Sequence, residues 1–596
     1  MSQGLPLYPF DVRREIGTIS EVGPTTAKVN LPRASSIEGQ SLHGHKVGAG
    51  EVGEFVIIDT GELGIFGRIV SIKLPEKERL AVEEEVGHAK EVHPLGTVQL
   101  LTAVSLKDGS VAGGISRYPR LGSNVFSAHP ELVKWIAEAT QRDGSVGSAV
   151  VLDLARLPDD SQTVVALTPD RLFGRHCAVL GTTGGGKSWT VARLIQEASH
   201  HNAKIILLDA TGEFHTLQGS VKHVHIGSST DEPENSTEVV LPYKELVEQD
   251  IYAIFKPSGQ TQGPKLRAAI KSLKVIKACP SLGTDGVFIK ARVKKEPFEK
   301  AYKNHSGTVE RSQADFDISK LVLQIEHECV WPNGGTNTNP DPTTWGGANE
   351  SERSYCISLL TRINDIIFSP ELGCVFNPGE KTSIITEIDQ FLGDVQNKVL
   401  HVSLKYLPFA HNAREIVANA IGRKLLAMAR TGRFRNHPVL TVLDEAHQFL
   451  DKSLGDENTK YPLDSFELIA KEGRKFCLTI CIATQRPRDI PEGVLSQMGT
   501  LLVHRLINDK DREVVERASG DIDRSAAAFL PTLGPGQAVI IGVDFAIPLT
   551  VQVVKPTNPP DSKGPNYQCH WLAKFEDAVR TETTSNKIIT CKDIGG

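Results

Sequence analysis

The first part of the chain contains short apolar or alternating runs separated by glycines. The segments IGTISEV, TAKVNL, EFVIID and FGRIVSI fall between residues 14 and 75. Several short strands at close spacing are typical of a small β-barrel. We therefore predict an N-terminal β-barrel domain over residues 1–95, in which the charged segment 76–95 forms a helix or linker. No cluster of potential catalytic residues occurs here, which favours a docking or assembly role for this domain.

Farther along, short apolar runs alternate with stretches of helical periodicity. The runs HCAVL, KIILLD, VLHVSL, VLTVL, CLTICIA, TLLVHRL, QAVIIGV and PLTVQVV have the length and composition of buried strands. WTVARLIQEA and AREIVANAIGRKLLAMARTGR repeat apolar residues at helical spacing. This alternation predicts an α/β core divided between residues 96–239 and 396–556. We expect strand 204–209 to lie beside strand 176–180, joined to it by a right-handed crossover.

Residues 240–395 interrupt the α/β pattern. Helical periodicity in YKELVEQDIYAIF, KLRAAIKSLKVIKA and SERSYCISLLTRINDII predicts a largely helical insertion. The segment 331–351 is rich in Gly, Asn, Pro and Thr and is predicted to be an exposed loop, while residues 557–596 are predicted to form a polar tail. The basic residues of the insertion would either form solvated helix faces or contact nucleic acid: Lys265, Arg267, Lys271, Lys274, Lys277, Lys290, Arg292, Lys294 and Lys295.

The strongest chemical motif is GTTGGGKS at residues 181–188, which lies between a predicted buried strand and an amphipathic helix. This is the context that the phosphate-loop pattern GxxxxGK[ST] requires. Glycines bring backbone N–H groups close to an anion, and the helix that follows points its positive dipole end to the same place. Lys187 would reach the β- and γ-phosphates of ATP, and the Ser188 hydroxyl would bind Mg²⁺. The predicted nucleotide-binding residues are Gly181, Thr182, Thr183, Gly184, Gly185, Gly186, Lys187, Ser188 and Trp189.

Carboxylates and an amide follow three of the predicted strands. Asp209 and Glu213 come at and after the end of KIILLD, and open α/β sheets bind ligands at the carboxyl ends of their strands. Asp444 and Glu445 end the run VLTVL, where the acids of phosphate-loop ATPases hold Mg²⁺ and polarise the attacking water. Gln485 ends CLTICIAT, where an amide could contact the γ-phosphate or the water. For Asp209, Glu213 and Gln485, a solvated polar group at a strand end is the alternative.

Composition narrows the class of protein. At 596 residues the chain is too long for one core, and 40% hydrophobic with 23% charged residues is ordinary for a globular protein. No apolar run is long enough to cross a membrane, and the N-terminus does not resemble a secretory signal. Nine scattered cysteines without CxxC spacing favour neither zinc nor a disulfide framework, so we expect a cytoplasmic protein. Because the net charge is −6, a positively charged surface that binds nucleic acid would have to be confined to one part of the molecule.

The motifs together are more specific than any one of them. RHCAVLGTTGGGKS, IILLDATGEF, VLTVLDEAHQFL, EGRKF and ATQRPRDIPEGVLSQMGTLLVHRL occur in this order and resemble the HerA family of hexameric DNA translocases, in the same superfamily as FtsK-type pumps. The resemblance implies a RecA-like phosphate-loop ATPase core with a small N-terminal barrel and a helical insertion. It implies that Lys187, Glu445, Gln485 and Glu213 are catalytic residues that act on ATP. It implies that Asp444 and Asp209 are metal ligands together with Ser188, and that Arg175 and Arg474 are catalytic arginines that reach a neighbouring subunit's nucleotide.

The resemblance also implies partners. It predicts a homohexamer on double-stranded DNA, working with a companion nuclease of the NurA kind or with an antiphage-defence effector such as a sirtuin-like NAD hydrolase. Two alternatives come from other classes of protein. One is an assembly ATPase that scaffolds and activates an effector while hardly moving DNA, and the other is a conjugation-type coupling pump, which the lack of a membrane span disfavours. For Arg175 and Arg474, an ion pair within one subunit is the alternative role.

Overall fold

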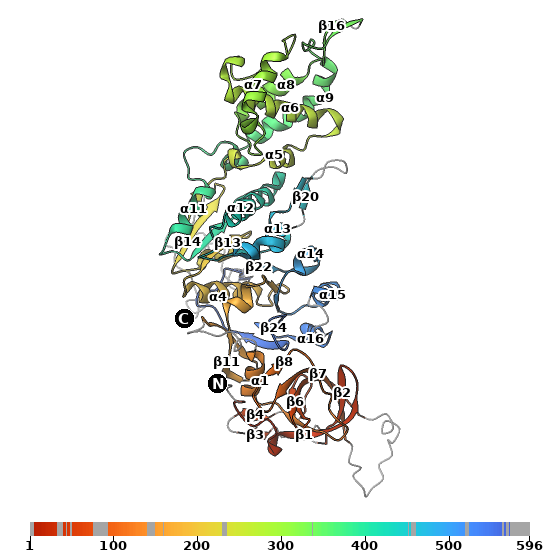
Figure 1. The fold of residues 1–596 in the computed structure, drawn as a ribbon. Helices are drawn as coiled ribbons and strands as arrows, with labels where there is room; N and C mark the ends of the chain where they lie inside the picture. Colours follow the sequence, from red (N-terminus) through yellow and green to blue (C-terminus); the bar gives the residue numbers. More distant parts are fainter. Residues whose placement is uncertain are drawn as a thin grey trace.

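The computed structural model describes residues 5–571 except 33–39, 43–44, 48–49, 75–92, 140–149, 159, 229–234, 337, 451, 455–460, 519–523, 563–565 and 568–570. Most of the predicted linker at 76–95 and most of the predicted tail at 557–596 therefore lie outside the described residues. The described chain is elongated, with a β-barrel at one end, a large sheet in the middle and a helical lobe at the other end (Figure 1). None of its described helices has the length and apolar character needed to span a bilayer.

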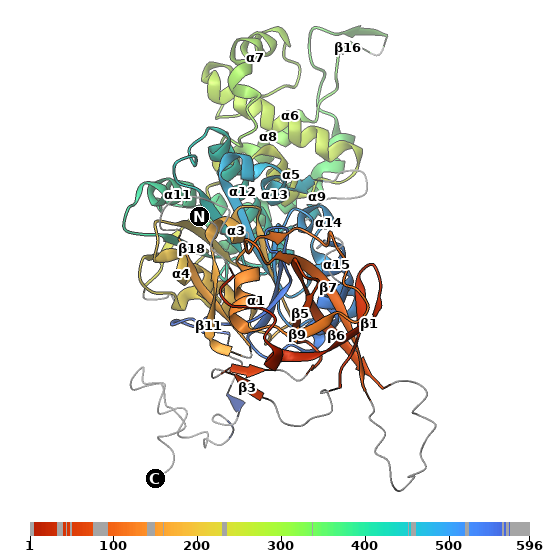
Figure 2. The same cartoon turned by 60° about the horizontal axis from the view of Figure 1, so that its bottom comes forward.

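The N-terminal domain is a closed antiparallel barrel of six strands, in the order β2-β1-β9-β5-β6-β7, and β7 pairs back with β2. The strands are β1 (Glu15–Val22), β2 (Thr26–Asn30), β5 (Phe55–Asp59), β6 (Leu63–Lys73), β7 (Leu95–Ser105) and β9 (Asn124–Ser127). The barrel predicted from the sequence is confirmed, but β7 and β9 extend it beyond residue 95. Closure requires them because β2 pairs with β7, and β9 joins β1 to β5. A short strand β8 (Val111–Ala112), the hairpin β3–β4 (Gln40–Leu42 and His45–Val47) and helix α1 (Pro130–Ala137) accompany it (Figures 1 and 2).

The middle domain is built on a 12-stranded sheet in the order β11-β10-β25-β24-β23-β12-β22-β19-β13-β18-β14-β15. Neighbours from β23 to β15 are parallel, and those from β11 to β23 are antiparallel. The strands are β10 (Leu152–Leu157), β11 (Asp160–Leu167), β12 (Cys177–Leu180), β13 (Lys204–Asp209), β14 (Val221–Ile226), β15 (Thr237–Val239), β18 (Val399–Ser403), β19 (Val439–Leu443), β22 (Leu478–Thr484), β23 (Thr500–Val503), β24 (Gln537–Gly542) and β25 (Leu549–Val553). The predicted α/β core, in two sequence parts, is confirmed.

One expected pairing is wrong. Strand β13 does not lie beside β12, because β22 and β19 lie between them: β12 pairs with β22, β22 with β19, and β19 with β13. Both inserted strands are almost wholly buried apolar segments, so they gain most by taking central positions in the sheet. As a result, the acids that follow β19 end up between the phosphate loop after β12 and the turn after β13.

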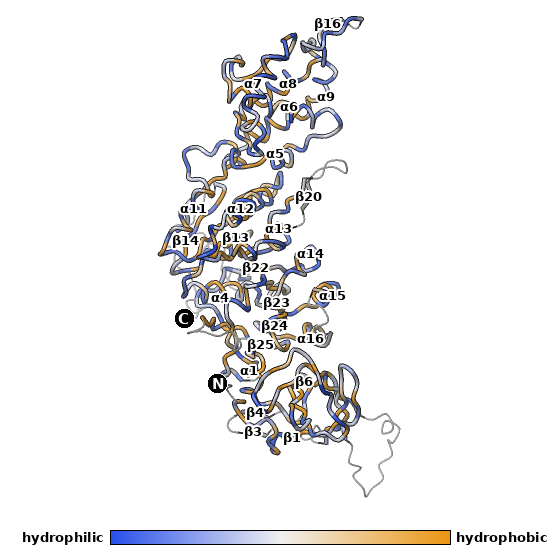
Figure 3. Tube along the Cα trace, viewed as in Figure 1, coloured by the Kyte–Doolittle hydropathy of each residue, from blue (hydrophilic) through white to orange (hydrophobic). Residues whose placement is uncertain are grey.

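The central strands are covered on both faces. Cys177 and Val179 of β12 belong to a buried cluster with helix α4 (Lys187–Ser199), α1 and the barrel residue Phe66. Ala178 and Leu180 belong to the opposite cluster, with α12 (Ala413–Arg430), α13 (Ser465–Glu472) and the insertion. This alternation along one strand is what a sheet buried on both faces requires. In Figure 3, apolar positions are accordingly interspersed with polar ones in all three parts of the molecule.

The segment between β15 and β18 is largely helical, as predicted. It contains α5 (Glu248–Phe255), α6 (Gly259–Ala278), α7 (Glu296–Val309), α8 (Leu321–Glu328), α9 (Glu350–Ile367), α10 (Gly373–Phe376) and α11 (Ile384–Gly393). Helix α6 contacts α7, α8 and α9 and so forms the centre of the lobe. The predicted loop at 331–351 contains a two-stranded hairpin, β16 (Gly334–Thr336) and β17 (Asn339–Asp341), which projects from the lobe (Figure 2).

Candidate active site

The phosphate loop lies between β12 and α4, as the sequence predicts. Gly184 and Gly186 have φ values of +77° and +108°, which disfavour any residue with a Cβ. A Cβ at Gly181 would come 2.6 Å from the Cβ of His504, so that position has no room for a side chain. The loop therefore wraps closely over β23 and ends at Lys187, the first residue of α4. Trp189, also predicted to bind nucleotide, has an exposed fraction of 36% on that helix.

Lys187 lies between the two predicted acids of β19. Its Nζ is 2.7 Å from Glu445 Oε1 and 3.2 Å from Asp444 Oδ1, and all three side chains are buried. Burial by itself would lower the pKa of Lys187, but the charges of Asp444 and Glu445 outweigh burial and raise it. The lysine is therefore a fixed positive charge at the amino end of α4, paired with two carboxylates.

Glu445 is held by contacts on several sides. Gln485 Nε2 donates to its Oε1 at 2.6 Å, and the Thr183 hydroxyl of the phosphate loop donates to the other end of the same amide. His447 Nδ1 is 3.2 Å from Glu445 Oε2. Burial would raise the pKa of Glu445, but His447 and Lys187 lower it to about 2. The residue also has φ +47°, the kind of strained backbone that collects at functional sites. Gln485 thus links the phosphate loop directly to a fully ionised carboxylate.

The acids near Lys187 carry more negative charge than one lysine neutralises. Burial raises the pKa of Asp444 to about 7; Lys187 opposes this shift, while Asp209, Glu445 and Glu213 add to it. Burial also raises the pKa of Glu213, which accepts a hydrogen bond from Ser188, and Glu213 Oε2 is buried without a hydrogen-bond partner. A cluster with surplus negative charge and an unsatisfied oxygen fits a divalent cation.

The residues available suit Mg²⁺ in particular. In the described part of the chain, no group of three or more His, Cys, Asp or Glu residues forms a complete metal site. Mg²⁺ commonly binds through one or two protein oxygens, with waters and substrate phosphates completing its shell. Ser188 and Asp444 are the residues that would hold it here.

Asp209, predicted as a metal ligand, has its carboxylate oxygens engaged by the protein. Its Oδ1 accepts from the N–H groups of Thr211 and Gly212 at 3.1 and 2.7 Å, and its Oδ2 accepts from the N–H of Phe214 at 2.9 Å and from His401 Nε2 at 2.9 Å. These contacts stabilise the turn that carries Glu213 and lower the pKa of Asp209 despite its burial. Asp209 therefore holds the turn that positions Glu213, and its carboxylate oxygens are not open to a metal ion.

A second histidine extends this contact. His401 Nδ1 is 2.8 Å from His223 Nδ1, and His223 Nε2 is 2.9 Å from the carbonyl oxygen of Leu217. Because a carbonyl only accepts, His223 donates through Nε2, and burial lowers the pKa of His223. Asp209, His401 and His223 thus form one chain of polar contacts, and at its inner end Asp209 and His401 are a buried pair.

This buried pair leads to a stability prediction. Replacing His401 with leucine leaves Asp209 charged and buried without its partner, which is expected to cost about 3 kcal/mol of stability. His401→Gln, which retains a donor for Asp209, is expected to lose clearly less. Thermal unfolding of the two variants measures the difference. Equal midpoints for wild type and His401→Leu would show that the pair contributes nothing.

The two predicted arginines lie at the other edge of the sheet. Arg175 precedes β12 and Arg474 precedes β22, whereas the phosphate loop follows β12. The length of strand β12 therefore separates the arginines from the phosphate loop by roughly 13 Å or more. Arg175 Nε is 3.4 Å from Asp544 Oδ2, which is the ion pair within one subunit that was the alternative role for this arginine. The Arg175 side chain is nevertheless 46% exposed. Arg474 is exposed and forms no ion pair with any described residue. The structure does not bring either arginine to its own subunit's phosphate loop.

Two functional residues were missed from the sequence. His504 is buried beneath the phosphate loop, where its Nδ1 donates to the carbonyl of Gln537 at 2.8 Å and its Nε2 is 2.8 Å from Thr190 Oγ1. Burial lowers its pKa to about 4, so it is a neutral support for the loop. His447 contacts Glu445 and is 3.1 Å from Thr484 Oγ1. The position of His447, two residues after Glu445, is the sequence signal that could have identified it. His504 is far from the phosphate loop in the sequence, so no local signal could have identified it.

The fold and this site define a phosphate-loop ATPase, an enzyme that binds ATP with Mg²⁺ and hydrolyses it. Residues 152–393 match the family model described as Helicase HerA, central domain. This part of the chain is therefore similar to the central domain of the HerA family.

Several known proteins are similar to this chain. The DNA double-strand break repair helicase HerA of Sulfolobus acidocaldarius is 23% identical over 427 residues, covering 69% of this chain and 71% of that protein. The protein of the same name from Saccharolobus solfataricus is 26% identical over 385 residues, covering 64% of each. Among solved structures, the plasmid coupling protein TrwB in complex with ADP and Mg²⁺ has 14% identity and a TM-score of 0.42, covering 71% of this chain and 93% of that one.

Proposed function

We propose that this ATPase is a translocase and helicase on double-stranded DNA, assembled as a ring. The observation that carries the proposal is the HerA central domain at residues 152–393 together with the Lys187, Glu445 and Gln485 contacts. The similar proteins named above are repair helicases. Contacts to DNA phosphates carry no sequence information, so movement along DNA would be independent of sequence.

The contacts in the structure support a specific order of events at the site. Lys187 is paired with Glu445 and Asp444 in the structure. When ATP binds, its phosphates take over Lys187, and the Glu445 carboxylate is released to accept a proton from the attacking water. Gln485, bonded to both Thr183 and Glu445, would move with either partner and so couple the phosphate loop to the catalytic acid. Mg²⁺, when bound, supplies positive charge to the phosphate oxygens.

We propose that the nucleotide lies between neighbouring subunits of the ring, and that the ring is a hexamer, as in the family that this chain resembles. Arg474, and secondarily Arg175, would reach a neighbour's nucleotide from the edge of the sheet opposite the phosphate loop. Within one subunit Lys187 already neutralises part of the phosphate charge, and an arginine from the neighbour would complete it. A companion nuclease of the NurA kind is the partner we favour, because the similar proteins are repair helicases; their names give no support to an NAD hydrolase effector.

The proposal is tested by DNA-dependent ATP hydrolysis. We expect duplex DNA to raise the ATPase rate, and the stimulation to fade between about 50 and 200 mM salt, as several phosphate contacts require. The rate is measured across that salt range with and without DNA, and again with a candidate partner nuclease present. A rate that DNA of every length leaves unchanged under both conditions would favour the assembly ATPase instead.

A further inference from the structure

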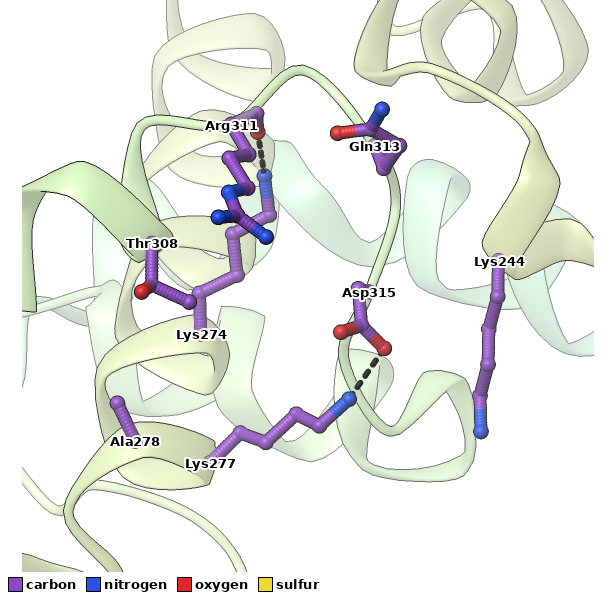
Figure 4. Close-up of a pocket in the computed structure, with 8 residues that line it drawn as sticks. All are labelled: Lys244, Lys274, Lys277, Ala278, Thr308, Arg311, Gln313 and Asp315. Atoms are coloured by element: carbon purple, nitrogen blue, oxygen red, sulfur yellow. Dashed lines mark hydrogen bonds and ion pairs between the residues drawn. The ribbon is translucent and has the colours of Figure 1, made fainter.

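The helical insertion contains a cavity of about 570 Å³ with a mostly basic lining (Figure 4). Helix α6 supplies Lys274 and Lys277, and Lys244 comes from the short helix Tyr243–Glu245. The segment that follows α7 supplies Arg311 and Asp315. Four cations and one acid thus face the same space, far from the phosphate loop in the fold (Figure 1).

Two of the four cations have acidic partners. Lys277 pairs with Asp315. Lys274, whose side chain is only 4% exposed, lies 2.5 Å from Glu248 Oε1. Lys244 and Arg311 are exposed and form no ion pair with any described residue. The cavity therefore retains two positive charges that nothing in the described chain neutralises.

The cavity is built on a firm frame. The N–H of Glu248 donates to the carbonyl of Ser312 at 2.9 Å, and the N–H of Ala314 donates to that of Leu246 at 2.8 Å. The buried Lys274 ammonium also donates to the Arg311 carbonyl at 2.6 Å, which fixes the backbone from which Arg311 extends. The Arg311 side chain is not part of this frame. Its guanidinium points into the cavity beside Lys274 (Figure 4).

We propose that this cavity binds phosphate groups, and that its ligand is the backbone of duplex DNA. Two uncompensated cations, one of them an arginine, suit the oxygens of phosphates. None of the eight lining residues is aromatic, so the cavity offers no surface on which a base would stack, and it recognises the backbone rather than a nucleoside. The choice of DNA as the source rests on the proposed function. The phosphate chemistry rests on the cavity alone.

The test compares three variants of the full chain by their binding to a 40-bp duplex, an oligonucleotide of about four helical turns. Lys244→Ala/Arg311→Ala removes the two unpaired cations. Lys300→Ala/Lys303→Ala removes two exposed lysines of α7 that do not line the cavity, and is the matched control. Asp315→Asn releases Lys277 from its ion pair, so its effect should have the opposite sign.

The readout is the slope of log binding constant against log salt concentration. Loss of two phosphate contacts should make the slope shallower by about 2 and weaken binding at every salt concentration. The control should leave the slope at the wild-type value, and Asp315→Asn should bind more tightly with a steeper slope. If the cavity pair and the control pair behave alike, DNA does not bind here.

Inorganic tripolyphosphate, measured by calorimetry, separates the possible sources of phosphate. Weaker tripolyphosphate binding by the cavity pair, with unchanged DNA binding, would retain the phosphate site and overturn DNA as its ligand. Wild-type protein that binds no duplex would refute the proposed function and DNA as the ligand together, while tripolyphosphate would still decide the chemistry of the cavity. No effect of the cavity pair on either ligand would overturn the proposal entirely.

Discussion

Glu445→Gln is expected to bind ATP yet hydrolyse it at least about 100-fold more slowly, the usual range for loss of a general base. Glutamine has the same shape and keeps an oxygen for the hydrogen bond from Gln485, so the site should remain assembled. The substitution also removes one of the two carboxylates that pair with Lys187. ATP would then compete with fewer negative charges, and its affinity should equal or exceed that of wild type. Nucleotide titration and steady-state turnover measure both effects.

Lys187→Ala is the matched comparison. It removes the phosphate contact and leaves Asp444 and Glu445 without their shared partner, so ATP binding and turnover should be lost together. The two variants thus separate binding from chemistry. Turnover at the wild-type rate in Glu445→Gln would show that another group activates the water.

Arg474→Ala is expected to reduce ATP turnover by about 10³–10⁵-fold, the range seen when a neighbour's arginine is lost in related enzymes. Arg474 cannot act on its own subunit's nucleotide, because it precedes β22 at the edge opposite the phosphate loop. Arg474→Lys should fail as well, since lysine does not reproduce the planar fork of the guanidinium. Lys475→Ala, at the exposed neighbouring position, is the control and should retain activity.

Mixed rings test whether the arginine acts between subunits. Subunits carrying Arg474→Ala are combined with subunits carrying Glu445→Gln, each nearly inactive alone. An interface with intact acids on one side and an intact arginine on the other is complete, so mixing should restore part of the activity. Co-assembly without any recovery, or sedimentation showing an active monomer, would exclude a shared site and leave Arg474 with a structural role.

The arginines also show what the sequence could and could not specify. EGRKF and RHCAVL identified Arg474 and Arg175 as candidates, but not where they lie. Only the parallel pairing of β12 with β22 places both at the edge opposite the phosphate loop. The ion pair of Arg175 with Asp544 depends on a contact between residues far apart in the chain.

The sequence by itself determined the phosphate loop, the acids at the end of β19, most strands and the helical character of the insertion. These features depend on local rules: the periodicity of apolar residues, the backbone freedom of glycine, and the residues that follow a buried strand. These local rules act in the same way wherever a segment lies in the fold. The structure therefore confirms the predicted elements, and the experiments described above test the chemical roles of their residues.

The tertiary structure decided the rest, because it depends on which distant segments pack together. It placed β22 and β19 between β12 and β13, and used β7 and β9 to close the barrel. It directed Asp209 towards the turn of residues 211–214 and His401, and so away from the metal position that the family resemblance implied. It also gathered Lys244, Lys274 and Arg311 around one cavity. Apart from the contacts of Asp209 with the turn at 211–214, these contacts join residues separated by tens to hundreds of positions, and the local sequence pattern carries no information about them.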